Sequence, residues 1–427
     1  MKSYVPSFHG GIDIIHESNK HVQDIIQTYI PNYALIVLKT NENQQDFRIL
    51  VYEGQEISEG QIIAQNANGF KIHAPIPCII HKIIKVQTPL GFISQAVVIK
   101  LSGYFTLSLK NSERYHWRSL NINDIRFLLN EKGVICTLTG KPLTEELANH
   151  ANADVLVINT LIQDALPQGE SQLFEYSKKR ILEAAAILNK IFNFSSIIIS
   201  VHSEYEFSSD ELKIIEELKI PVNYKIFPLK YPQAHNAMIE KALTKSFNKN
   251  EKHSFLILET RTLIAVYDAV VKNKPYIEQY VFVGGNCLKT SAMMKAKIGT
   301  PIGALIEELG GFINKPDNIV INSIMNGSQT HDLDTPVTKN IKSIIVLHDT
   351  MIHHKTSTIC SSCGACIDIC PSSCNPMEMY KMLQYNLQFK NAKNDLKKCI
   401  TCGLCTYICP NFIKLQDLFF KSKRDLL

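Results

Sequence analysis

Two cysteine-rich stretches near the C-terminus decide the fold of this part of the chain. The first is CSSCGACIDICP, residues 360–371, and the second is CITCGLCTYICP, residues 399–410. Each has the spacing C-x2-C-x2-C-x3-C and ends in Cys-Pro. The eight cysteines are Cys360, Cys363, Cys366 and Cys370 in the first stretch and Cys399, Cys402, Cys405 and Cys409 in the second. Because thiolates are strong metal ligands, the pattern predicts two metal centres.

The spacing is that of bacterial ferredoxins, whose cysteines bind [4Fe-4S] clusters. Three thiolates close in sequence must reach three corners of a small cube, and Gly364 and Gly403 allow the tight turn that this requires. In two-cluster ferredoxins the fourth cysteine, before proline, ligates the other cluster. We therefore predict that cluster 1 is held by Cys360, Cys363, Cys366 and Cys409, and cluster 2 by Cys399, Cys402, Cys405 and Cys370.

A pair of structural zinc sites is the alternative. Zinc sites favour two C-x2-C pairs separated by a longer loop, which leaves the third cysteine and the Cys-Pro of each stretch unexplained. We predict that Cys374, just outside the first stretch, is a packed or free thiol. Cys78, Cys136 and Cys287 are scattered along the chain. The sequence therefore favours iron–sulfur clusters over zinc, and a reducing compartment over a disulfide framework.

Length and composition indicate a multidomain globular protein. The 427 residues are too many for one core and predict three or four domains. Hydrophobic residues make up 45% and charged residues 20%, and the net charge of +5 is mild for this length. The N-terminal MKSYVPSFHGG lacks the apolar segment of a signal peptide. The apolar runs are shorter than the ~20 residues of a membrane helix, so we expect no membrane span, and we expect no nucleic-acid partner.

Residues 1–115 predict a β domain that resembles the barrel-sandwich hybrid fold of biotinyl and lipoyl domains. Gly54 and Gly60 mark two tight turns between short strands. In biotinyl and lipoyl domains a hairpin tip presents a lysine, but here the corresponding position is Pro77-Cys78. We therefore expect a structural module rather than a carrier. The expected strands are Ala34–Leu38, Phe47–Tyr52, Ile79–Val86 and Ala96–Leu101.

The rest of the chain predicts three further domains. Residues 116–275 alternate strands with helices, which implies a largely parallel sheet covered on both faces. Residues 276–350 predict a small α+β unit, and residues 351–427 hold the cysteines, a helical spacer and a basic tail, Lys414–Arg424. Expected strands are Asp154–Asn159, Ser196–Val201, Val222–Pro228 and Ser254–Leu258, and expected helices are Gln172–Ile191, Ser209–Lys219, Ala234–Lys245, Thr262–Lys272 and Met377–Leu387.

Several short motifs resemble the RnfC/RsxC family, a component of the Rnf-type ion-translocating electron transport complex. They are FHGGI at Phe8–Ile12, KYPQ at Lys230–Gln233, AVYDAVVKNKPYIE at Ala265–Glu278, IGTPI at Ile298–Ile302 and DTPVTK at Asp334–Lys339. The resemblance implies a barrel-sandwich hybrid, an α/β domain that binds FMN and NADH, an SLBB-like β-grasp unit and a two-cluster ferredoxin domain. It also implies a peripheral subunit at the cytoplasmic face of a membrane complex, in which NADH reduces FMN and electrons pass through the clusters to partners that move Na⁺ or H⁺.

The sequence departs from this family where the flavin should bind. A phosphate-binding loop needs clustered glycines, but the segment in place of the family's G-x-G-G-A-G-F-P-T loop has only Gly133 and Gly140. We therefore interpret Lys230 as a solvated lysine rather than a flavin-phosphate contact, and Gly284-Gly285 as a turn. The four departing segments are Asn130–Thr144, Asn159–Pro167, Ala234–Asn236 and Asn322–Gly327.

These patterns favour an electron-transfer subunit that has two [4Fe-4S] clusters and has lost FMN and NADH. No catalytic residue and no FMN- or NADH-binding residue is assigned. The expected partners are other subunits of a membrane complex, with a protein electron donor and acceptor. The eroded loops count against NADH oxidation by the chain itself. Two alternatives stay open: an NADH-oxidising FMN/iron–sulfur subunit, and a scaffold whose clusters only stabilise the fold.

Overall fold

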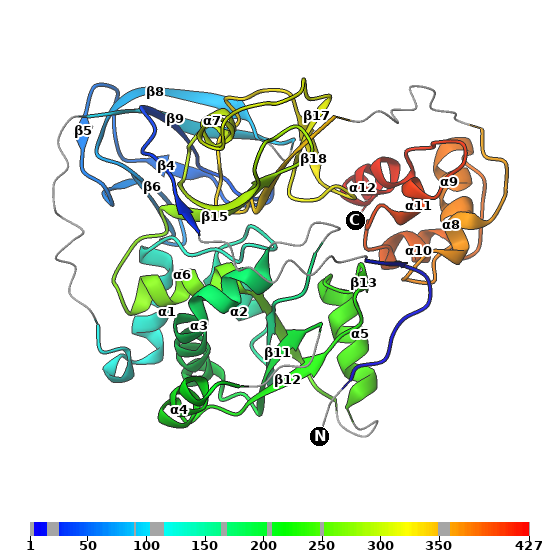
Figure 1. Ribbon diagram of the computed structural model, residues 1–427, viewed down its shortest axis with the longest axis horizontal. Helices are drawn as coiled ribbons and strands as arrows, with labels where there is room; N and C mark the ends of the chain where they lie inside the picture. The colour runs from blue at the N-terminus through cyan, green and yellow to red at the C-terminus, as the bar shows by residue number, and fades with distance from the viewer. Residues whose placement is uncertain are drawn as a thin grey trace.

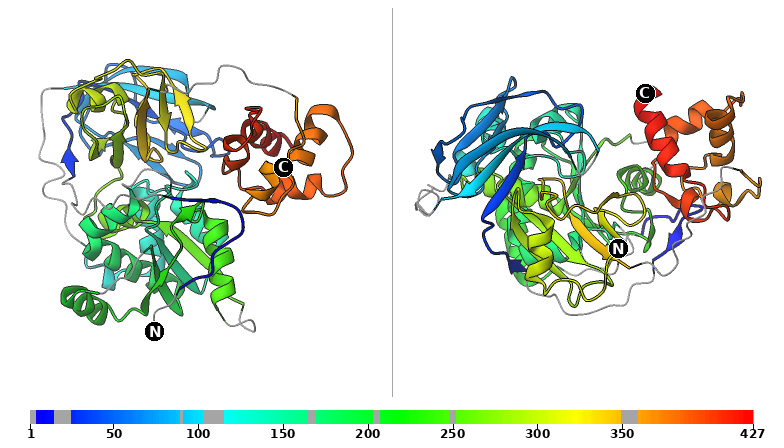
Figure 2. Two further views of the ribbon diagram at one scale, coloured as in Figure 1. Left: turned by 45° about the vertical axis from the view of Figure 1, so that its right-hand side comes forward. Right: turned by 90° about the horizontal axis from the view of Figure 1, so that it is seen from above.

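The computed structural model describes residues 4–14, 25–88, 91–102, 115–163, 169–202, 207–247, 252–348 and 359–426. Figure 1 shows two β-rich parts above an α/β part, with the helical C-terminal domain to one side. The two further views in Figure 2 show the same separation of the C-terminal helices from the rest of the chain. In the described part of the chain no helix is both long and apolar enough to cross a membrane.

A parallel four-stranded sheet forms the centre of the α/β part, as predicted. Its strand order is β12-β11-β10-β14. Alternate residues of β10 point to opposite faces, so that Val155 and Val157 join one core and Leu156 and Ile158 another. Both faces are therefore buried, as expected of parallel sheets. The strands are β10 (Val155–Asn159), β11 (Ser196–Val201), β12 (Val222–Ile226) and β14 (Phe255–Glu259).

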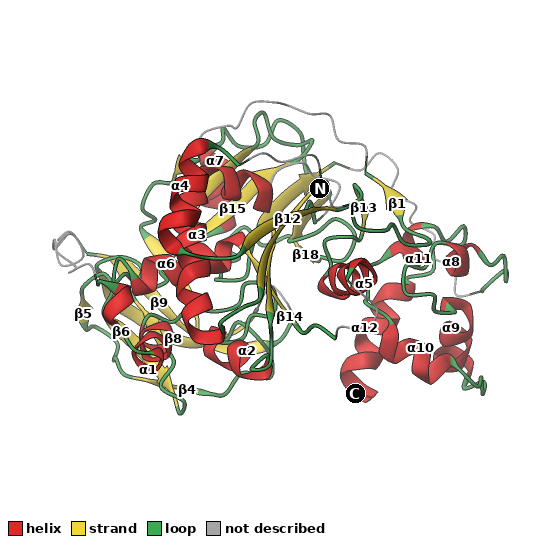
Figure 3. Cartoon of the chain, turned by 90° about the horizontal axis from the view of Figure 1, so that it is seen from below, coloured by secondary structure: helices red, strands yellow, loops and turns green. Residues whose placement is uncertain are grey.

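Helices cover both faces of this sheet. The long helix α3 (Glu170–Phe192) and α6 (Thr260–Val270) pack on the face of Leu156, and α5 (Asn236–Ser246) packs on the face of Val155. Figure 3 shows α5 on the side that approaches the C-terminal helices. Three shorter helices complete this part: α1 (Ile122–Glu131), α2 (Leu143–Asn149) and α4 (Ser209–Leu218).

Two antiparallel sheets form the barrel-sandwich part. One has the order β3-β9-β8-β5 and the other β4-β6-β7. Gly54 and Gly60 have φ values of 84° and 80°, which fits the two predicted turns. Pro77 and Cys78 are buried, because Cys78 begins β8 and pairs with Leu101; they do not form the expected hairpin tip. The strands are β3 (Tyr33–Val37), β4 (Phe47–Ile49), β5 (Glu56–Ile57), β6 (Ile62–Asn66), β7 (Lys71–His73), β8 (Cys78–Gln87) and β9 (Ile93–Leu101).

A mixed six-stranded sheet follows the α/β part. Its order is β18-β17-β19-β15-β16-β2. Helix α7 (Ile302–Glu308) packs Leu305 and Ile306 against the core of this sheet. The edge strand β2 comes from the first part of the chain and pairs with β16. The strands are β2 (Ile26–Gln27), β15 (Glu278–Gly284), β16 (Ala292–Lys297), β17 (Asn318–Ile321), β18 (Ser328–Thr330) and β19 (Ser343–Leu347).

The cysteine-rich domain is built as a repeat. In each half a short helix contains the third cysteine, and a longer helix follows the Cys-Pro. The offset between the halves is constant, since residues 360 and 376 of the first half correspond to 399 and 415 of the second. The helices are α8 (Ala365–Asp368), α9 (Pro376–Tyr385), α10 (Ala392–Lys398), α11 (Leu404–Tyr407) and α12 (Leu415–Leu426). The expected helical spacer is α9, and the basic tail is α12.

The segment of residues 4–14 joins the α/β part to the cysteine-rich domain, and we call it the N-terminal strap. Strand β1 (Ile12–Asp13) pairs with β13 (Lys230–Tyr231). On its other side the strap contacts the cysteine-rich domain, where the Gly11 N–H donates to the Ile369 carbonyl at 2.8 Å. A Cβ on Gly10 would lie 2.5 Å from the same oxygen. The FHGGI motif is thus explained by close backbone packing (Figure 1, dark blue).

Candidate functional site

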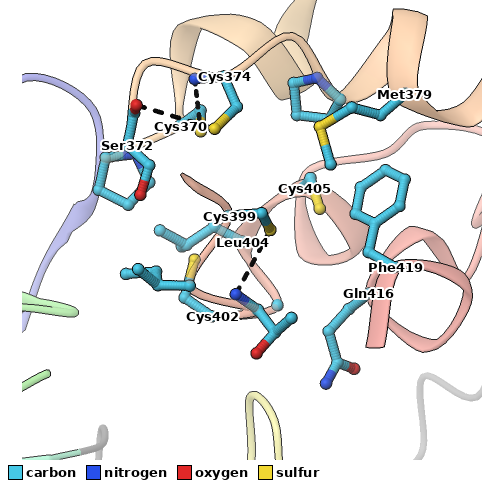
Figure 4. Close-up of a pocket in the computed structure, with 15 residues that line it drawn as sticks. Cys370, Ser372, Cys374, Met379, Cys399, Cys402, Leu404, Cys405, Gln416 and Phe419 are labelled. Carbon is cyan, nitrogen blue, oxygen red and sulfur yellow. Dashed lines mark hydrogen bonds between the residues drawn. The ribbon is translucent and has the colours of Figure 1, made fainter. Parts of the chain in front are cut away.

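The eight cysteines of the two stretches line two cavities, four in each. One is lined by Cys360, Cys363, Cys366 and Cys409, and the other by Cys370, Cys399, Cys402 and Cys405, with Cys374 from outside the two stretches also in its wall. These are the same two sets of four that the ferredoxin spacing predicts. In Figure 4 the side chains of Cys399, Cys402 and Cys405 gather around the second cavity, with Phe419 of α12 beside them.

The local backbone explains how three cysteines of each stretch reach one cavity. Ser362 and Gly364 adopt positive φ angles of 57° and 82°, and Thr401 and Gly403 repeat this with 50° and 86°. The turn aims the N–H of Ser362 at the Cys360 sulfur at 3.4 Å. The Thr401 N–H lies 3.4 Å from the Cys399 sulfur in the same way. Successive N–H groups in such turns stabilise negative charge on sulfur.

The two cavities differ in their access to solvent. Cys363 is exposed at the first cavity, whereas Cys402 is buried at the second. Burial raises the pKa of Cys402 to about 12, and burial together with the nearby Cys360 and Cys363 raises that of Cys366 to about 11. These thiols therefore stay protonated at neutral pH until cations enter the cavity, and metal binding releases their protons.

Cys374 is a fifth cysteine in the wall of the second cavity, where it is buried and makes hydrogen bonds of its own. Its thiol donates to the Asp395 carbonyl at 3.4 Å, and its N–H donates to the Cys370 sulfur at 3.4 Å. A side-chain hydrogen bond from Cys374, helped by the Cys374 and Ser372 N–H groups, lowers the pKa of Cys370 to about 6 against the effect of burial. The structure thus gives Cys374 a supporting contact with one predicted ligand (Figure 4).

The donor sets fit iron–sulfur clusters. A four-iron cluster takes one thiolate at each of four irons. The first cavity offers four cysteine sulfurs, and the second offers four from the two stretches together with Cys374. A single zinc ion instead needs four ligands within about 2.3 Å of one point. In the part of the chain that the structure describes, no three histidine, cysteine or acidic side chains converge on one ion in this way. The cysteines line the walls of two cavities, an arrangement that fits a cluster in each.

A third cavity, of about 260 Å³, lies between the α/β part, the six-stranded sheet and the cysteine-rich domain. All four segments in which the sequence departs from the flavin-binding family reach its wall. They contribute Thr137 and Leu138, then Gln163, then Ala234 and His235, then Asn322, Ser323, Asn326 and Gly327. Residues 164–167 of the second segment lie outside the described residues. Cys402 completes the wall, so that the third cavity adjoins the second cysteine cavity.

The two glycines in the first departing segment face protein backbone. A Cβ on Gly133 would lie 2.3 Å from the Lys71 carbonyl oxygen, and one on Gly140 would lie 2.5 Å from that of Thr40. Both glycines therefore allow contact with the barrel-sandwich part. They do not form a phosphate cradle, which needs N–H groups open to the anion.

Polar side chains at the third cavity form hydrogen bonds and an ion pair with other groups of the protein. Lys342 lies 2.7 Å from a carboxylate oxygen of Glu259 and donates to Gln163 at 2.7 Å. The Thr137 hydroxyl donates to the other oxygen of Glu259 at 2.6 Å. Burial opposes ionisation of Glu259, but Lys342 and these hydrogen bonds hold its pKa below the usual range. Among the described residues of this wall, the only lysine is therefore already paired with an internal carboxylate.

Lys230, on β13, contacts the N-terminal strap. Its ammonium donates to the Phe8 carbonyl at 3.1 Å and lies 5.0 Å from the centre of the Phe8 ring. The side chain is half-buried, so the prediction of a solvated lysine is wrong. The reason is the strap itself, whose contact with Lys230 spans 222 positions of sequence. Gly285 turns beside Val346, where a Cβ would lie 2.0 Å from a carbonyl oxygen, which fits the expected turn.

Two residues at the third cavity were not singled out from the sequence. His235 accepts a hydrogen bond from the Ala237 N–H at 3.2 Å and so caps α5. Burial lowers the pKa of His235 to about 4, which keeps its ring neutral. Tyr231 donates from its hydroxyl to the Cys402 carbonyl at 2.6 Å. The sequence signal that could have identified them is the KYPQ motif, which contains Tyr231 and ends two residues before His235.

Family comparisons agree with two parts of this architecture. Residues 6–103 match the family described as RnfC barrel sandwich hybrid domain. Residues 352–410 match the 4Fe-4S dicluster domain, which implies two [4Fe-4S] clusters. The barrel-sandwich and ferredoxin predictions are thereby confirmed.

Curated relatives extend the similarity over most of the chain. The C subunit of the proton-translocating ferredoxin:NAD(+) oxidoreductase complex of Clostridium ljungdahlii is 24% identical over 81% of this chain and 77% of its own length. The C subunit of the ion-translocating oxidoreductase complex of Pectobacterium atrosepticum is 22% identical over 89% of this chain, which spans only 56% of that relative. Among solved structures, an NAD+-reducing [NiFe]-hydrogenase in the H2-reduced state has a TM-score of 0.47 at 11% identity and covers 71% of this chain and 60% of its own. The chain is a distant homologue in the RnfC family of oxidoreductase-complex subunits.

Proposed function

We propose that this chain is a peripheral subunit at the cytoplasmic face of an ion-translocating membrane oxidoreductase complex and carries electrons between protein partners through two [4Fe-4S] clusters. The observation that carries the proposal is the pair of cavities, each lined by four cysteines of the two stretches. The printed names of the relatives supply the setting, since both proteins are subunits of ion- or proton-translocating complexes. Within this proposal the six-stranded sheet with α7 is the family's SLBB-like β-grasp unit.

The residues of the chain would hold the clusters in the crossed arrangement. Cys360, Cys363, Cys366 and Cys409 would ligate cluster 1, and Cys399, Cys402, Cys405 and Cys370 would ligate cluster 2. Such clusters take up and release single electrons when bound. Met379 and Tyr380, neighbours on α9, line the second and first cavity respectively. This places the two cavities side by side, as an electron relay requires.

We further infer that the chain has lost the flavin and NADH site of its family. The support is the third cavity, whose wall collects all four departing segments. Gly133 and Gly140 pack on protein backbone, and Lys342 is paired with Glu259. A flavin phosphate would therefore meet neither clustered N–H groups nor an unpaired cation on the described part of this wall. Electrons must then come from another protein.

One experiment tests both statements. The protein is purified without oxygen, its iron, sulfide and flavin are quantified, and NADH is added. We expect about eight irons and eight sulfides per chain, no flavin, and clusters that dithionite reduces but NADH does not. A stoichiometric flavin and bleaching by NADH alone would overturn the loss of the flavin site. Clusters that no reductant of physiological potential can reduce would identify a scaffold.

A flavin-containing NADH-oxidising subunit is the second candidate. The observation in its favour is that a cavity of about 260 Å³ persists beside Cys402, where a flavin could pass electrons to cluster 2. The flavin content measured above separates the two candidates. Addition of FMN to the purified protein, followed by gel filtration, gives an independent check that needs no enzymatic activity.

A further inference from the structure

The two cysteine cavities face different surroundings. At the second cavity, Cys402 and Leu404 are buried against Tyr231, with Met325 packed beside them. A Cβ on Gly403 would lie only 2.2 Å from the Met325 carbonyl oxygen. The body of the protein therefore covers cluster 2 on this side. At the first cavity, by contrast, Ser361, Cys363 and Pro410 of the wall are exposed.

Two large and exposed apolar side chains lie close to the open cavity. Ile359 is 72% exposed and Phe412 is 42% exposed. Ile359 is held at the cavity because its carbonyl accepts a hydrogen bond from the Asn411 side chain at 2.6 Å, and Asn411 lines the cavity. We call Ile359, Ser361, Cys363, Asn411 and Phe412 the cluster-1 rim. Apolar side chains clustered on a surface mark an interaction site more often than single ones do.

Most of the net positive charge of the chain lies in the cysteine-rich domain. Residues 359–427 contain nine lysines and arginines and five acidic residues, a formal net charge of +4 out of +5 for the whole chain. Lys381 lies beside the rim, where it donates to the Ser362 hydroxyl at 3.0 Å. Lys414 is the exposed residue between Ile413 and Leu415, which both line the cavity. A basic surface around an apolar patch complements an acidic partner.

We propose that the cluster-1 rim is the docking site of a small, acidic, one-electron carrier protein. In each encounter the reduced carrier loses one electron and this protein gains one, with no bond made or broken. The apolar side chains of the rim exclude water at the contact, and Lys381 and Lys414 steer the negative carrier toward it. The proposal rests on the proposed electron-transfer function and names where electrons enter.

The make-up of the rim suits a brief encounter. Redox complexes that must form and dissociate rapidly bury less than about 1,200 Å² in total. Two exposed apolar side chains with two lysines close to them provide this kind of contact. The attraction between the charges should weaken steeply with salt, since the Debye length falls from about 10 Å at 0.1 M to about 3 Å at 1 M.

The test measures binding as well as electron transfer. An acidic [2Fe-2S] ferredoxin serves as the probe, and its dissociation constant is measured anaerobically by calorimetry at about 0.05 M and 0.5 M salt. The charge variant is Lys381→Glu with Lys414→Glu, and its control is Lys390→Glu with Lys393→Glu, two exposed lysines at α10 and the loop before it. The apolar variant is Ile359→Ser. Its control is Ile93→Ser, because Ile93 is 71% exposed on β9.

We expect the rim charge variant to weaken binding about tenfold at low salt and little at high salt, while its control changes binding much less. Ile359→Ser should weaken binding at both salt concentrations, and Ile93→Ser at neither. Equal binding by rim and control variants would overturn the docking site, even if the clusters are present and reducible. If the rim variants bind the ferredoxin as the wild type does but no longer sediment with anionic phospholipid vesicles, the rim is a membrane contact and the docking site is overturned. Iron and sulfide contents, measured for every variant, report separately on the proposed function.

Discussion

The Tyr231 hydroxyl donates a hydrogen bond of 2.6 Å to the main-chain carbonyl of Cys402. This bond joins β13 of the α/β part to the loop that carries three of the predicted cluster-2 ligands. Tyr231→Phe removes the hydroxyl but keeps the ring against Leu404. Loss of one partner of a buried hydrogen bond costs about 1–3 kcal/mol. We expect this variant to loosen the contact between the two parts without loss of iron.

Hydrogen exchange followed by mass spectrometry measures this effect. The peptide that contains Cys402 and Gly403 should exchange faster in Tyr231→Phe, while its iron content equals that of the wild type. Tyr407→Phe is the control, because Tyr407 is an exposed tyrosine of the same domain. Unchanged exchange in Tyr231→Phe would show that the apolar contacts alone hold the loop.

The ligand assignment predicts opposite results for two cysteines of the first half of the repeat. Cys363→Ser should lose about half of the iron and sulfide, since one of two clusters loses a ligand. Cys374→Ser should keep both clusters, because the Cys374 thiol is directed to the Asp395 carbonyl. Iron and sulfide analysis of the two variants checks this. Equal iron loss in both would place Cys374 among the ligands.

The crossed arrangement makes a prediction of its own. Cys360→Ser and Cys409→Ser should damage the same cluster, although the residues lie in different stretches. Cys370→Ser should damage the other one, although Cys370 shares a stretch with Cys360. The spectrum of the remaining reduced cluster in electron paramagnetic resonance distinguishes these cases. If Cys360→Ser instead matches Cys370→Ser, each cluster is held by a single stretch.

Sequence patterns are sufficient for the features that local spacing encodes. The eight cysteines are grouped by spacing and by the proline that follows each fourth one, and the same grouping appears in the cavities. Runs such as Ser196–Val201 are predicted as strands because continuous apolar stretches of this length suit a buried parallel sheet. The helix predicted at Ser209–Lys219 from a Ser/Asp cap is present as Ser209–Leu218, and Ser208 and Glu211 form a capping box at its start.

Contacts between distant segments could not be predicted in this way. Strand β1 is two residues long and pairs with β13 more than two hundred positions later, and no periodicity marks such a pair. The role of Lys230 follows from that pairing, as does the position of Tyr231 beside Cys402. The edge strand β2 joins a sheet whose other strands begin at Glu278. The third cavity is likewise a product of domain packing, although the segments on its wall were identified one by one.

The two repeat glycines provide a matched pair of substitutions. Gly364 and Gly403 have nearly the same φ, 82° and 86°. A Cβ on Gly364 meets no atom of the described residues within 4 Å, but one on Gly403 would lie 2.2 Å from the Met325 carbonyl oxygen. Gly364→Ala should therefore cost only the strain of a left-handed alanine, about 1–2 kcal/mol. Gly403→Ala should cost more, because it also pushes the cysteine-rich domain away from the loop of Met325.

Thermal unfolding of the two variants, followed by the loss of cluster absorbance, measures the difference. We expect a lower transition temperature for Gly403→Ala than for Gly364→Ala. Hydrogen exchange near Met325 should increase only in Gly403→Ala, which separates domain contact from local strain. Equal transition temperatures would mean that the Met325 loop moves aside at little cost.

Lys339, the last residue of the DTPVTK motif, should make the free energy of unfolding depend on pH. It is buried, donates to the Gly133 carbonyl at 2.6 Å and lies 5.2 Å from the centre of the Phe70 ring. Burial lowers the pKa of Lys339 from 10.5 to about 7. Between these values the unfolded chain binds more protons than the folded one, so stability rises with pH by up to about 1.4 kcal/mol per pH unit. Below pH 7 both states hold the proton and this contribution to the slope vanishes.

Lys339→Met removes this titration and keeps an unbranched side chain of similar length. Urea unfolding midpoints at pH 6, 7, 8 and 9 should rise more steeply above pH 7 in the wild type than in Lys339→Met. The exposed Lys213 supplies the control, since Lys213→Met removes a lysine that stays in water. Its profile should run parallel to the wild type, because Lys213 is 72% exposed and its substitution leaves the buried Lys339 in place. A parallel profile for Lys339→Met as well would show that the Gly133 carbonyl and the Phe70 ring keep the ammonium charged in the folded protein.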